Sequence, residues 1–212
     1  MTKILLADDH PVIRAGLKIF IEKVISPALI DEVWDTDMAY EKIKQNEYAL
    51  VILDAAIAGI DSFTLVHDTL ALKPNVKILM FSVNNQDIYA KKYLQLGAKG
   101  YISKDASEAE IENAIHNVLN NKRYISASLM ETIANSALGH NTDNPFDKLS
   151  PREFEIARHL IRGEALSEIS NKLNLHSSTV STYKNRVYEK LNCRNIIDIN
   201  SLAKLYKVIP AF

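Results

Sequence analysis

The 212-residue sequence has very little of three features that define whole classes of protein. It contains one cysteine, Cys193, which excludes a disulfide framework and a cysteine-based metal site. It has no run of about 18 apolar residues, the length that a membrane-spanning helix needs. Its first residues, MTKILLADDH, lack the layout of a signal peptide, because the apolar stretch is short and runs into acids. We therefore expect a globular protein of the reducing cytoplasm without a membrane anchor.

The formal net charge of −1 is spread unevenly. Residues 145–212 carry 11 Lys and Arg against 7 Asp and Glu, a formal charge of +4. Residues 1–144 carry 14 against 19, a formal charge of −5. An acidic part joined to a basic part suggests different partners for each, although chance accounts for the charges alone equally well.

The first 121 residues alternate between two kinds of apolar pattern. Nearly continuous apolar runs predict strands at KILLA (3–7), DEVWD (31–35), ALVIL (49–53), VKILMF (76–81) and KGYIS (99–103). Amphipathic stretches predict helices near 11–24, 37–46, 62–72, 85–96 and 106–121. Such alternation is typical of a parallel sheet that helices cover on both faces, so we expect an α/β domain with right-handed crossovers.

The pattern changes after residue 124. Gly, Asn, Asp and Pro accumulate toward 138–147, which favours a linker there. Only helical patterns follow, and they predict helices at 151–161, 166–173, 177–190 and 195–206. We therefore divide the chain into a first domain over 1–124, a linker over 125–145 and a small all-α domain over 146–212.

Polar side chains stand where the predicted strands end. Asp8 and Asp9 follow the first strand, and Asp54 follows the third. Ser82 and Lys104 follow the fourth and fifth. Because the carboxyl ends of parallel strands emerge at one edge of the sheet, we expect these side chains to lie together. The second run, DEVWD, is less apolar and suits an edge strand away from the group.

Three carboxylates in one place require a counter-charge. Two of them about 4 Å apart repel by roughly 4 kcal/mol at an effective dielectric of about 20. Oxygen ligands without a neighbouring His or Cys suit Mg²⁺. Lys104 can pair with an anion on Asp54, and Ser82 can donate a hydrogen bond to that anion. Asp54 is then placed to become an acyl phosphate as a nucleophile.

Simpler interpretations exist for the single residues. A lone Asp after a strand is most often a helix cap, and only the convergence of all five side chains favours a site. His10, which precedes Pro11, is expected to be a surface residue at a helix start rather than a ligand. Trp34 and Met80 are expected in the core.

The motifs LLADDHPVIRAGL, ALVILD, ILMFS and AKGYISKD resemble the receiver domain of two-component response regulators over about residues 1–121. The resemblance implies a flavodoxin-like, doubly wound sheet of five parallel strands in the order 2-1-3-4-5. It implies Asp54 as the phosphoacceptor. The Mg²⁺ ligands that it implies are Asp9, Asp8 through a water, Asp54 and the backbone carbonyl of Ala56. The residues implied for phosphoryl contact are Ser82 and Lys104, and the implied switch residues are Ser82 and Tyr101.

The acceptor loop, DAAIAGIDSF, departs from the family's pattern. Ile57 and Ala58 stand where Met-Pro is common, which is expected to free the loop somewhat, and Ser62 replaces a Gly. Ala56 stands two residues after Asp54, where a polar group often tunes the phosphoryl lifetime. Two alternatives stay open: a DNA-binding regulator with a degenerate receiver that phosphate does not switch, and a less favoured aspartyl phosphohydrolase, which usually needs Asp at position 56.

The segment 149–192 begins with a helix-start signal. Ser150 is followed by Pro151 at the first helical position and by Glu153 three residues on. Gly163 is expected to end this helix.

The helix predicted near 177–190 has two distinct faces. Core contacts are expected from Val180, Tyr183, Val187 and Leu191. The other face combines short polar side chains with flanking cations, which suits a helix in a major groove, although an ordinary solvated face is the alternative. The residues expected to contact DNA are Ser178, Thr179, Ser181, Thr182, Lys184, Asn185, Arg186 and Lys190.

The motifs LSPRE, LSEISNKL and STVSTYKNRVYEKLN, in this order, resemble the LuxR-type helix-turn-helix of the NarL family over about 146–208. The family often has Lys where Ser181 stands and His where Tyr183 stands. Together the two resemblances extend over both predicted domains. They imply a transcriptional response regulator that a sensor histidine kinase phosphorylates and that binds promoter DNA, as a homodimer at least when phosphorylated. They imply no enzyme activity beyond its own phosphotransfer and dephosphorylation.

Overall fold

The computed structural model describes residues 1–59, 61–83, 87–127, 129–131, 134 and 144–208. The chain forms two compact units. The first comprises residues 1–85 and 93–130, and the second comprises residues 86–92 and 131–212.

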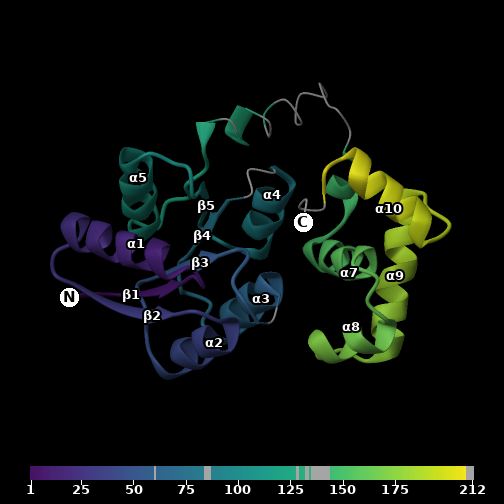
Figure 1. Cartoon of the computed structure of the whole chain (residues 1–212), viewed down its shortest axis with the longest axis horizontal. Coiled ribbons are helices and arrows are strands. Elements are labelled where there is room, and N and C mark those ends of the chain that lie inside the picture. The colour runs from purple at the N-terminus through teal and green to yellow at the C-terminus, as the bar shows by residue number, and fades with distance from the viewer. Residues whose placement is uncertain (60, 84–86, 128, 132–133, 135–143, 209–212) are drawn as a thin grey trace. The chain divides into compact units, whose positions relative to one another are not determined.

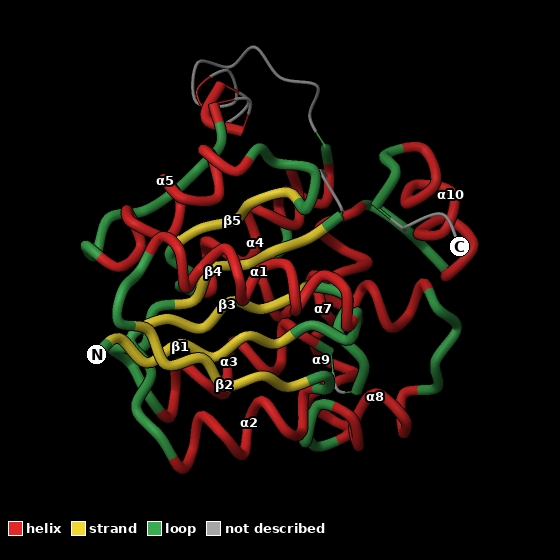
Figure 2. The backbone as a smooth tube through the Cα atoms, turned by 60° about the vertical axis from the view of Figure 1, so that its left-hand side comes forward, coloured by secondary structure: helices red, strands yellow, loops and turns green. Residues whose placement is uncertain are grey.

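Strands and helices alternate through residue 119 (Figure 1). The strands are β1 (Thr2–Ala7), β2 (Ala28–Val33), β3 (Leu50–Asp54), β4 (Ile78–Ser82) and β5 (Gly100–Ser103). The helices are α1 (Pro11–Val24), α2 (Thr36–Gln45), α3 (Ser62–Leu72), α4 (Asp87–Leu96) and α5 (Glu108–Leu119). All neighbouring strands are parallel, in the order β2-β1-β3-β4-β5 (Figure 2). The predicted doubly wound sheet is therefore confirmed.

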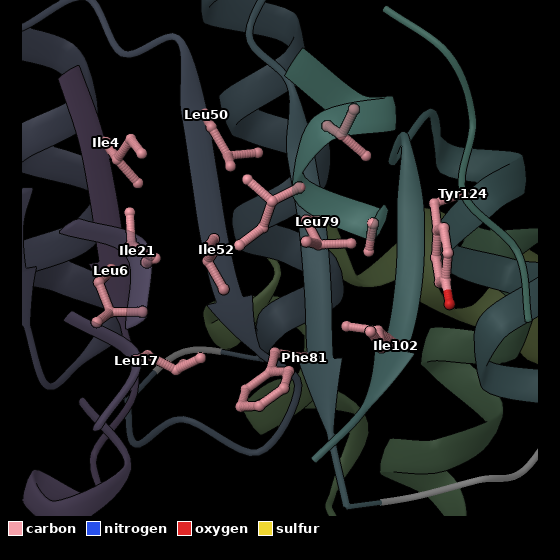
Figure 3. Packing of buried hydrophobic residues seen from close by; sticks show 13 residues of the cluster. Ile4, Leu6, Leu17, Ile21, Leu50, Ile52, Leu79, Phe81, Ile102 and Tyr124 are labelled. Carbon is pink, nitrogen blue, oxygen red and sulfur yellow. The ribbon is translucent and has the colours of Figure 1, made fainter. Parts of the chain in front are cut away.

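Alternate side chains of the strands pack under α1 and α5 (Figure 3). The strand residues of this layer are Ile4, Leu6, Leu50, Ile52, Leu79, Phe81 and Ile102. The helix residues are Leu17 and Ile21 of α1, and Ala114, Ile115 and Val118 of α5. Burying one such apolar side chain contributes about 1.5–3 kcal/mol to the stability of the fold, so this layer holds the sheet firmly against α1 and α5.

The other face of the sheet is buried as well. Leu5, Val51 and Met80 point the opposite way from the residues of the first layer, and each is at most 1% exposed. Met80 was expected in the core, and this is confirmed. Burial on both faces explains why the strands read as continuous apolar runs rather than as alternating ones.

The second strand differs from its prediction. β2 covers Ala28–Val33 and ends before Trp34, whereas the sequence predicted a strand over 31–35. Trp34 was expected in the core, but it is 53% exposed, with the guanidinium of Arg14 over its ring at 5.9 Å. β2 lies at the sheet edge, and Asp35 already caps α2 by accepting a hydrogen bond from the Met38 amide. β2 therefore ends at Val33, directly before the residues that lead into α2.

The second unit contains a short 3₁₀ helix, η1 (Pro145–Lys148), followed by α7 (Pro151–Ile161), α8 (Leu166–Lys172), α9 (Ser177–Leu191) and α10 (Ile196–Leu205). Its core joins Ile156 and Leu160 of α7, Ile169 of α8 and Val180 of α9, among others. Ser150 and Glu153 form the predicted capping box of α7. Gly163, with a φ of +79°, follows the end of this helix as predicted.

The linker expected at 125–145 falls largely on residues 128, 132–133 and 135–143, which lie outside the described residues. Across the described ranges, every helix is too short or too polar to cross a bilayer.

Candidate functional site

The strand register brings the predicted polar residues to one edge of the sheet. Asp54 is the last residue of β3, and Asp8 follows Ala7, which pairs with Leu53 in the neighbouring strand. Ser82 ends β4 and pairs with Ser103, so Lys104 directly follows that pair. Asp8, Asp54 and Ser82 are each 1% exposed. The three strand ends therefore enclose a buried polar site.

Lys104 is the cation of this site. Its Nζ lies 2.6 Å from Oδ2 of Asp8 and 2.9 Å from Oδ2 of Asp54. The Lys104 amide donates to the Ser82 carbonyl at 2.8 Å, which fixes the backbone from which the side chain reaches inward. Both Nζ–Oδ2 distances are those of charge-assisted hydrogen bonds, so one ammonium serves two carboxylates. Lys104 therefore pairs with both buried acids at once and joins the ends of β1 and β3.

Burial raises the pKa of Asp54, and the nearby carboxylate of Asp8 acts in the same direction. The Lys104 ammonium and the Ala56 amide oppose this change without cancelling it. A raised pKa means that the fold holds the ionised form of Asp54 less well than water does. Additional positive charge at Asp54 would therefore be stabilising.

Asp9 and His10 stand at the outer side of the cluster. The Asp9 side chain is 32% exposed, and its Oδ1 lies 2.8 Å from Nδ1 of His10. His10 is the residue before α1, and its side chain is 60% exposed, as expected for a surface residue at a helix start. Its Nδ1 also lies 3.2 Å from Oδ1 of Asp8. The assumption that no His lies near the carboxylates was wrong.

Atoms of Asp8, Asp9, His10 and Asp54 that could bind a metal ion lie within 4.8 Å of one another. The cluster holds three carboxylates, and the Lys104 ammonium pairs with two of them. A hard, oxygen-binding divalent cation fits this donor set. The site is therefore an acidic cluster able to hold a metal ion.

The acceptor loop is tied to the sheet at several points. The Ala56 amide donates to Oδ1 of Asp54 at 3.1 Å, and the Ala55 amide donates to the Phe81 carbonyl at 3.3 Å. The Ala58 carbonyl accepts from the Thr36 amide at 2.9 Å. The sequence predicted a freer loop because Ala58 replaces a common Pro. These hydrogen bonds supply other restraints in its place.

Tyr101 of β5, the expected switch residue, is 5% exposed. Its ring centroid lies 6.1 Å from that of Tyr93 in α4, in a stacked arrangement. Its side chain is therefore inside the unit in this structure.

The helix α9 separates its faces as predicted. Val180, Val187 and Leu191 are buried, and Tyr183 packs against the core from a half-buried position. Most of the opposite face is open. Ser178, Thr182, Asn185, Arg186 and Lys190 are exposed, whereas Thr179, Ser181 and Lys184 are half-buried. Thr182 donates its hydroxyl to the Ser178 carbonyl at 2.9 Å, so its side chain lies along the helix.

Lys190 has a partner that the sequence did not indicate. Its Nζ lies 2.7 Å from Oε2 of Glu153, whose side chain is 4% exposed. Burial tends to raise the pKa of Glu153, but hydrogen bonds from Lys190 and the Ser150 amide hold it below its usual value. Lys190 therefore joins α9 to the start of α7.

The comparisons with known proteins cover both units. The model of the response regulator receiver domain matches residues 4–116, and that of the luxR family of bacterial regulatory proteins matches residues 147–203. The response regulator UvrY of Escherichia coli K12 is 31% identical over 204 residues, which are 96% of this chain and 94% of UvrY. The response regulator GacA of Pseudomonas syringae pv. syringae is 29% identical over 212 residues, which cover 100% of this chain and 99% of GacA.

A solved structure is similar in fold along nearly the whole chain. RcsB from Salmonella enterica serovar Typhimurium, bound to the promoter rprA in the presence of the phosphomimetic BeF3⁻, superposes with a TM-score of 0.74. It is 23% identical and covers 96% of this chain and 98% of its own. The two family models, the strand order of the sheet and the cluster of Asp8, Asp54 and Lys104 point to the same family. The chain therefore belongs to the DNA-binding two-component response regulators that join a receiver domain to a luxR-type helix-turn-helix domain.

Proposed function

We propose that this chain is a transcription regulator that a phosphoryl group on Asp54 switches. The observation that carries the proposal is the position of the Lys104 ammonium between the buried carboxylates of Asp8 and Asp54. A purely structural ion pair needs one acid per ammonium, whereas the Lys104 ammonium faces two buried acids and Asp9 adds a third acid to the cluster. The excess suits a phosphotransfer centre that takes up a metal ion and then a phosphoryl group.

The transfer uses Asp54 as the nucleophile. A carboxylate oxygen of Asp54 attacks the phosphorus of a phosphohistidine on a sensor kinase, the P–N bond breaks, and an aspartyl phosphate forms. The Lys104 ammonium then pairs with a phosphoryl oxygen, and the Ser82 hydroxyl donates a hydrogen bond to the phosphoryl group. Tyr101 responds to the movement of Ser82. Mg²⁺ held by Asp8, Asp9, Asp54 and the Ala56 carbonyl would neutralise charge on the reacting oxygens.

The second half of the function is DNA binding by α9. We propose that Ser178, Thr179, Ser181, Thr182 and Asn185 face base edges and that Lys184, Arg186 and Lys190 face phosphates. The phosphorylated chain binds promoter DNA as a homodimer in the cytoplasm. We retain the division into a receiver over 1–124, a linker over 125–145 and a DNA-binding domain over 146–212. Beyond promoting its own phosphotransfer and dephosphorylation, the receiver has no enzymatic role.

Incorporation of phosphate from acetyl phosphate tests the proposal. In the presence of Mg²⁺ the wild type should form a hydroxylamine-labile phosphoprotein, Asp54→Asn should form none, and Asp9→Ala should form nearly none because Mg²⁺ binds more weakly. Asp68→Asn, which alters an exposed acid of α3, is the matched control and should behave like the wild type.

The outcomes separate the alternatives. A wild type that takes up no phosphate would favour the degenerate receiver that binds DNA regardless of signal. Sustained release of inorganic phosphate over many turnovers would favour the phosphohydrolase. Normal labelling of Asp54→Asn would place the acceptor elsewhere.

A further inference from the structure

One peptide group beside Asp54 is held at both of its ends. The unit between Ala55 and Ala56 donates its N–H to Oδ1 of Asp54 at 3.1 Å. Its carbonyl, on Ala55, accepts a hydrogen bond from the Ser62 hydroxyl at 2.6 Å. A peptide group is planar, so a restraint on its C=O also restrains the direction of its N–H. Ser62 thereby fixes the donor that points at the acceptor carboxylate.

Ser62 in turn has a second, buried partner. It is the first residue of α3, is 4% exposed, and has its Oγ 2.7 Å from the hydroxyl oxygen of Tyr93. A serine hydroxyl has a single proton, which Ser62 gives to Ala55. The Tyr93 hydroxyl is therefore the donor in the second hydrogen bond. The direction of donation runs from Tyr93 through Ser62 to the Ala55 carbonyl.

Tyr93 is itself fixed by packing. It is 1% exposed, and its ring stacks on that of Phe63 with centroids 4.0 Å apart and planes 13° apart. On another side it contacts the ring of Tyr101 with a centroid distance of 6.1 Å. The packing of these rings therefore fixes the position of the Tyr93 hydroxyl.

We propose that Ser62 and Tyr93 are positioning residues for phosphoryl transfer to Asp54. Their hydrogen bonds fix the Ala56 amide on Oδ1 while Lys104 faces Oδ2, so both oxygens of the carboxylate have a set position. A nucleophile held in its reactive orientation reacts faster because less freedom is lost in the transition state. The inference rests on the proposed role of Asp54 as acceptor and adds two residues that act on it through the backbone.

This arrangement also accounts for two departures in the acceptor loop. Ser62 stands where the family's pattern has Gly, and a Gly would supply no hydroxyl for the Ala55 carbonyl. Ala58 stands where the pattern has Pro, whose fixed φ restrains the backbone. A hydrogen bond through Ser62 restrains the same loop by other means.

Three variants of the full chain test the inference. Ser62→Ala removes the hydroxyl that holds the peptide group, and Tyr93→Phe removes the donor to Ser62 while keeping the stacked ring. Thr69→Val is the matched control: Thr69 is also on α3 and 1% exposed, and its hydroxyl has no hydrogen-bond partner among the described residues.

Phosphorylation by acetyl phosphate is measured against donor concentration at saturating Mg²⁺. For Ser62→Ala we expect the maximal rate constant to fall about threefold to tenfold, the factor that one hydrogen bond accounts for, with an unchanged half-saturating donor concentration. Tyr93→Phe should show a smaller fall of the same kind, and Thr69→Val none. The amide resonance of Ala56 in ¹H–¹⁵N spectra should move in the first two variants but not in the control.

Each outcome bears on a separate claim. Wild-type rates and an unmoved Ala56 resonance in Ser62→Ala would overturn the inference while leaving Asp54 as acceptor. If the rate constant falls in Ser62→Ala but is unchanged in Tyr93→Phe, Ser62 is a positioning residue and Tyr93 is not. A wild type that takes up no phosphate would overturn the proposed function and this inference together. Tyr93→Phe keeps the test decisive if Ser62→Ala does not fold, because its ring still fills the core.

Discussion

The charge balance of the receiver site depends on one residue, Lys104. Its ammonium faces two carboxylates that are each 1% exposed. Removing one member of a buried ionic group leaves the others uncompensated, which costs about 3 kcal/mol or more. Lys104→Met should therefore lower the free energy of unfolding of the receiver by about 3 kcal/mol at neutral pH.

Chemical denaturation with and without Mg²⁺ measures this effect. A cation that binds only the folded state stabilises it, so Mg²⁺ should restore more stability to Lys104→Met than it adds to the wild type. Lys77→Met is the control, because Lys77 donates to the Leu119 carbonyl rather than to a carboxylate. Equal losses in both variants would mean that the packing of the lysine stem, rather than its charge, holds the site.

We expect Asn185 of α9 to read a base. It is exposed, and an Asn side chain can pair bidentately with adenine, which is worth about 1–3 kcal/mol of discrimination. Asn185→Ala should thus lose sequence preference. Lys184→Ala and Arg186→Ala should instead weaken binding to all sequences and lower its salt dependence. Competition between a selected target and random duplex DNA measures the affinity and the sequence preference of each variant. If Asn185→Ala keeps the sequence preference of the wild type, Asn185 does not contact base edges.

The sequence predicted some of the site residues and missed others for a physical reason. The strand ends brought Asp8, Asp54 and Lys104 together, because strand register follows directly from apolar pattern. The Ser62–Tyr93 and Glu153–Lys190 contacts join segments distant in the chain. The periodicity of apolar residues within one segment carries no information about such contacts. They could be found only once the helices were packed.

At the scale of elements, the edge strand β2 is fixed by a polar contact rather than by a second neighbouring strand. The Tyr48 hydroxyl donates to Oδ2 of Asp31 in β2 at 2.6 Å, and Nζ of Lys3 in β1 lies 3.4 Å from the same oxygen. Tyr48→Phe should lower the free energy of unfolding by about 1–2 kcal/mol at pH 7, since it removes a hydrogen bond to a charged group.

The pH dependence of this loss has a definite sign. The hydrogen bond from Tyr48, followed by the charge of Lys3, holds the pKa of Asp31 below its usual value. The stabilisation is therefore complete above the unfolded pKa of about 3.9 and is lost as pH falls through the lower folded value. The difference between Tyr48→Phe and the wild type should shrink below about pH 4. Tyr40→Phe, whose hydroxyl has no hydrogen bond within the described ranges, should show no such trend.

The elements themselves were largely predictable, and their ends were less so. The central strands β3 and β4 were predictable as continuous apolar runs, because both of their faces are buried. β2 did not, because its residues are mostly half-buried and the pattern DEVWD mixes strand residues with the Asp35 cap of the next helix. Side-chain caps, such as Ser107 with Glu110 before α5, set helix starts more sharply than periodicity does.

At the scale of the whole molecule, the two parts carry opposite charge. Residues 1–144 have a formal charge of −5 and residues 145–212 one of +4, from the same sequence counts. A basic domain is attracted to DNA phosphates, whereas an acidic one is repelled by them. The charge asymmetry thus agrees with the family's division into a receiver domain and a DNA-binding domain.

Coupling between these two functions must be reciprocal. If a phosphoryl mimic on Asp54 raises the affinity for DNA by some factor, DNA must raise the affinity for that mimic by the same factor. We expect a factor of about ten, within the usual range of such couplings. DNA binding is measured with and without beryllofluoride and Mg²⁺, and beryllofluoride binding with and without a selected duplex. Asp54→Asn should show no coupling in either direction. If DNA leaves the beryllofluoride affinity of the wild type unchanged, the receiver does not control α9. The DNA-binding regulator with a degenerate receiver, which phosphate does not switch, is then the better account.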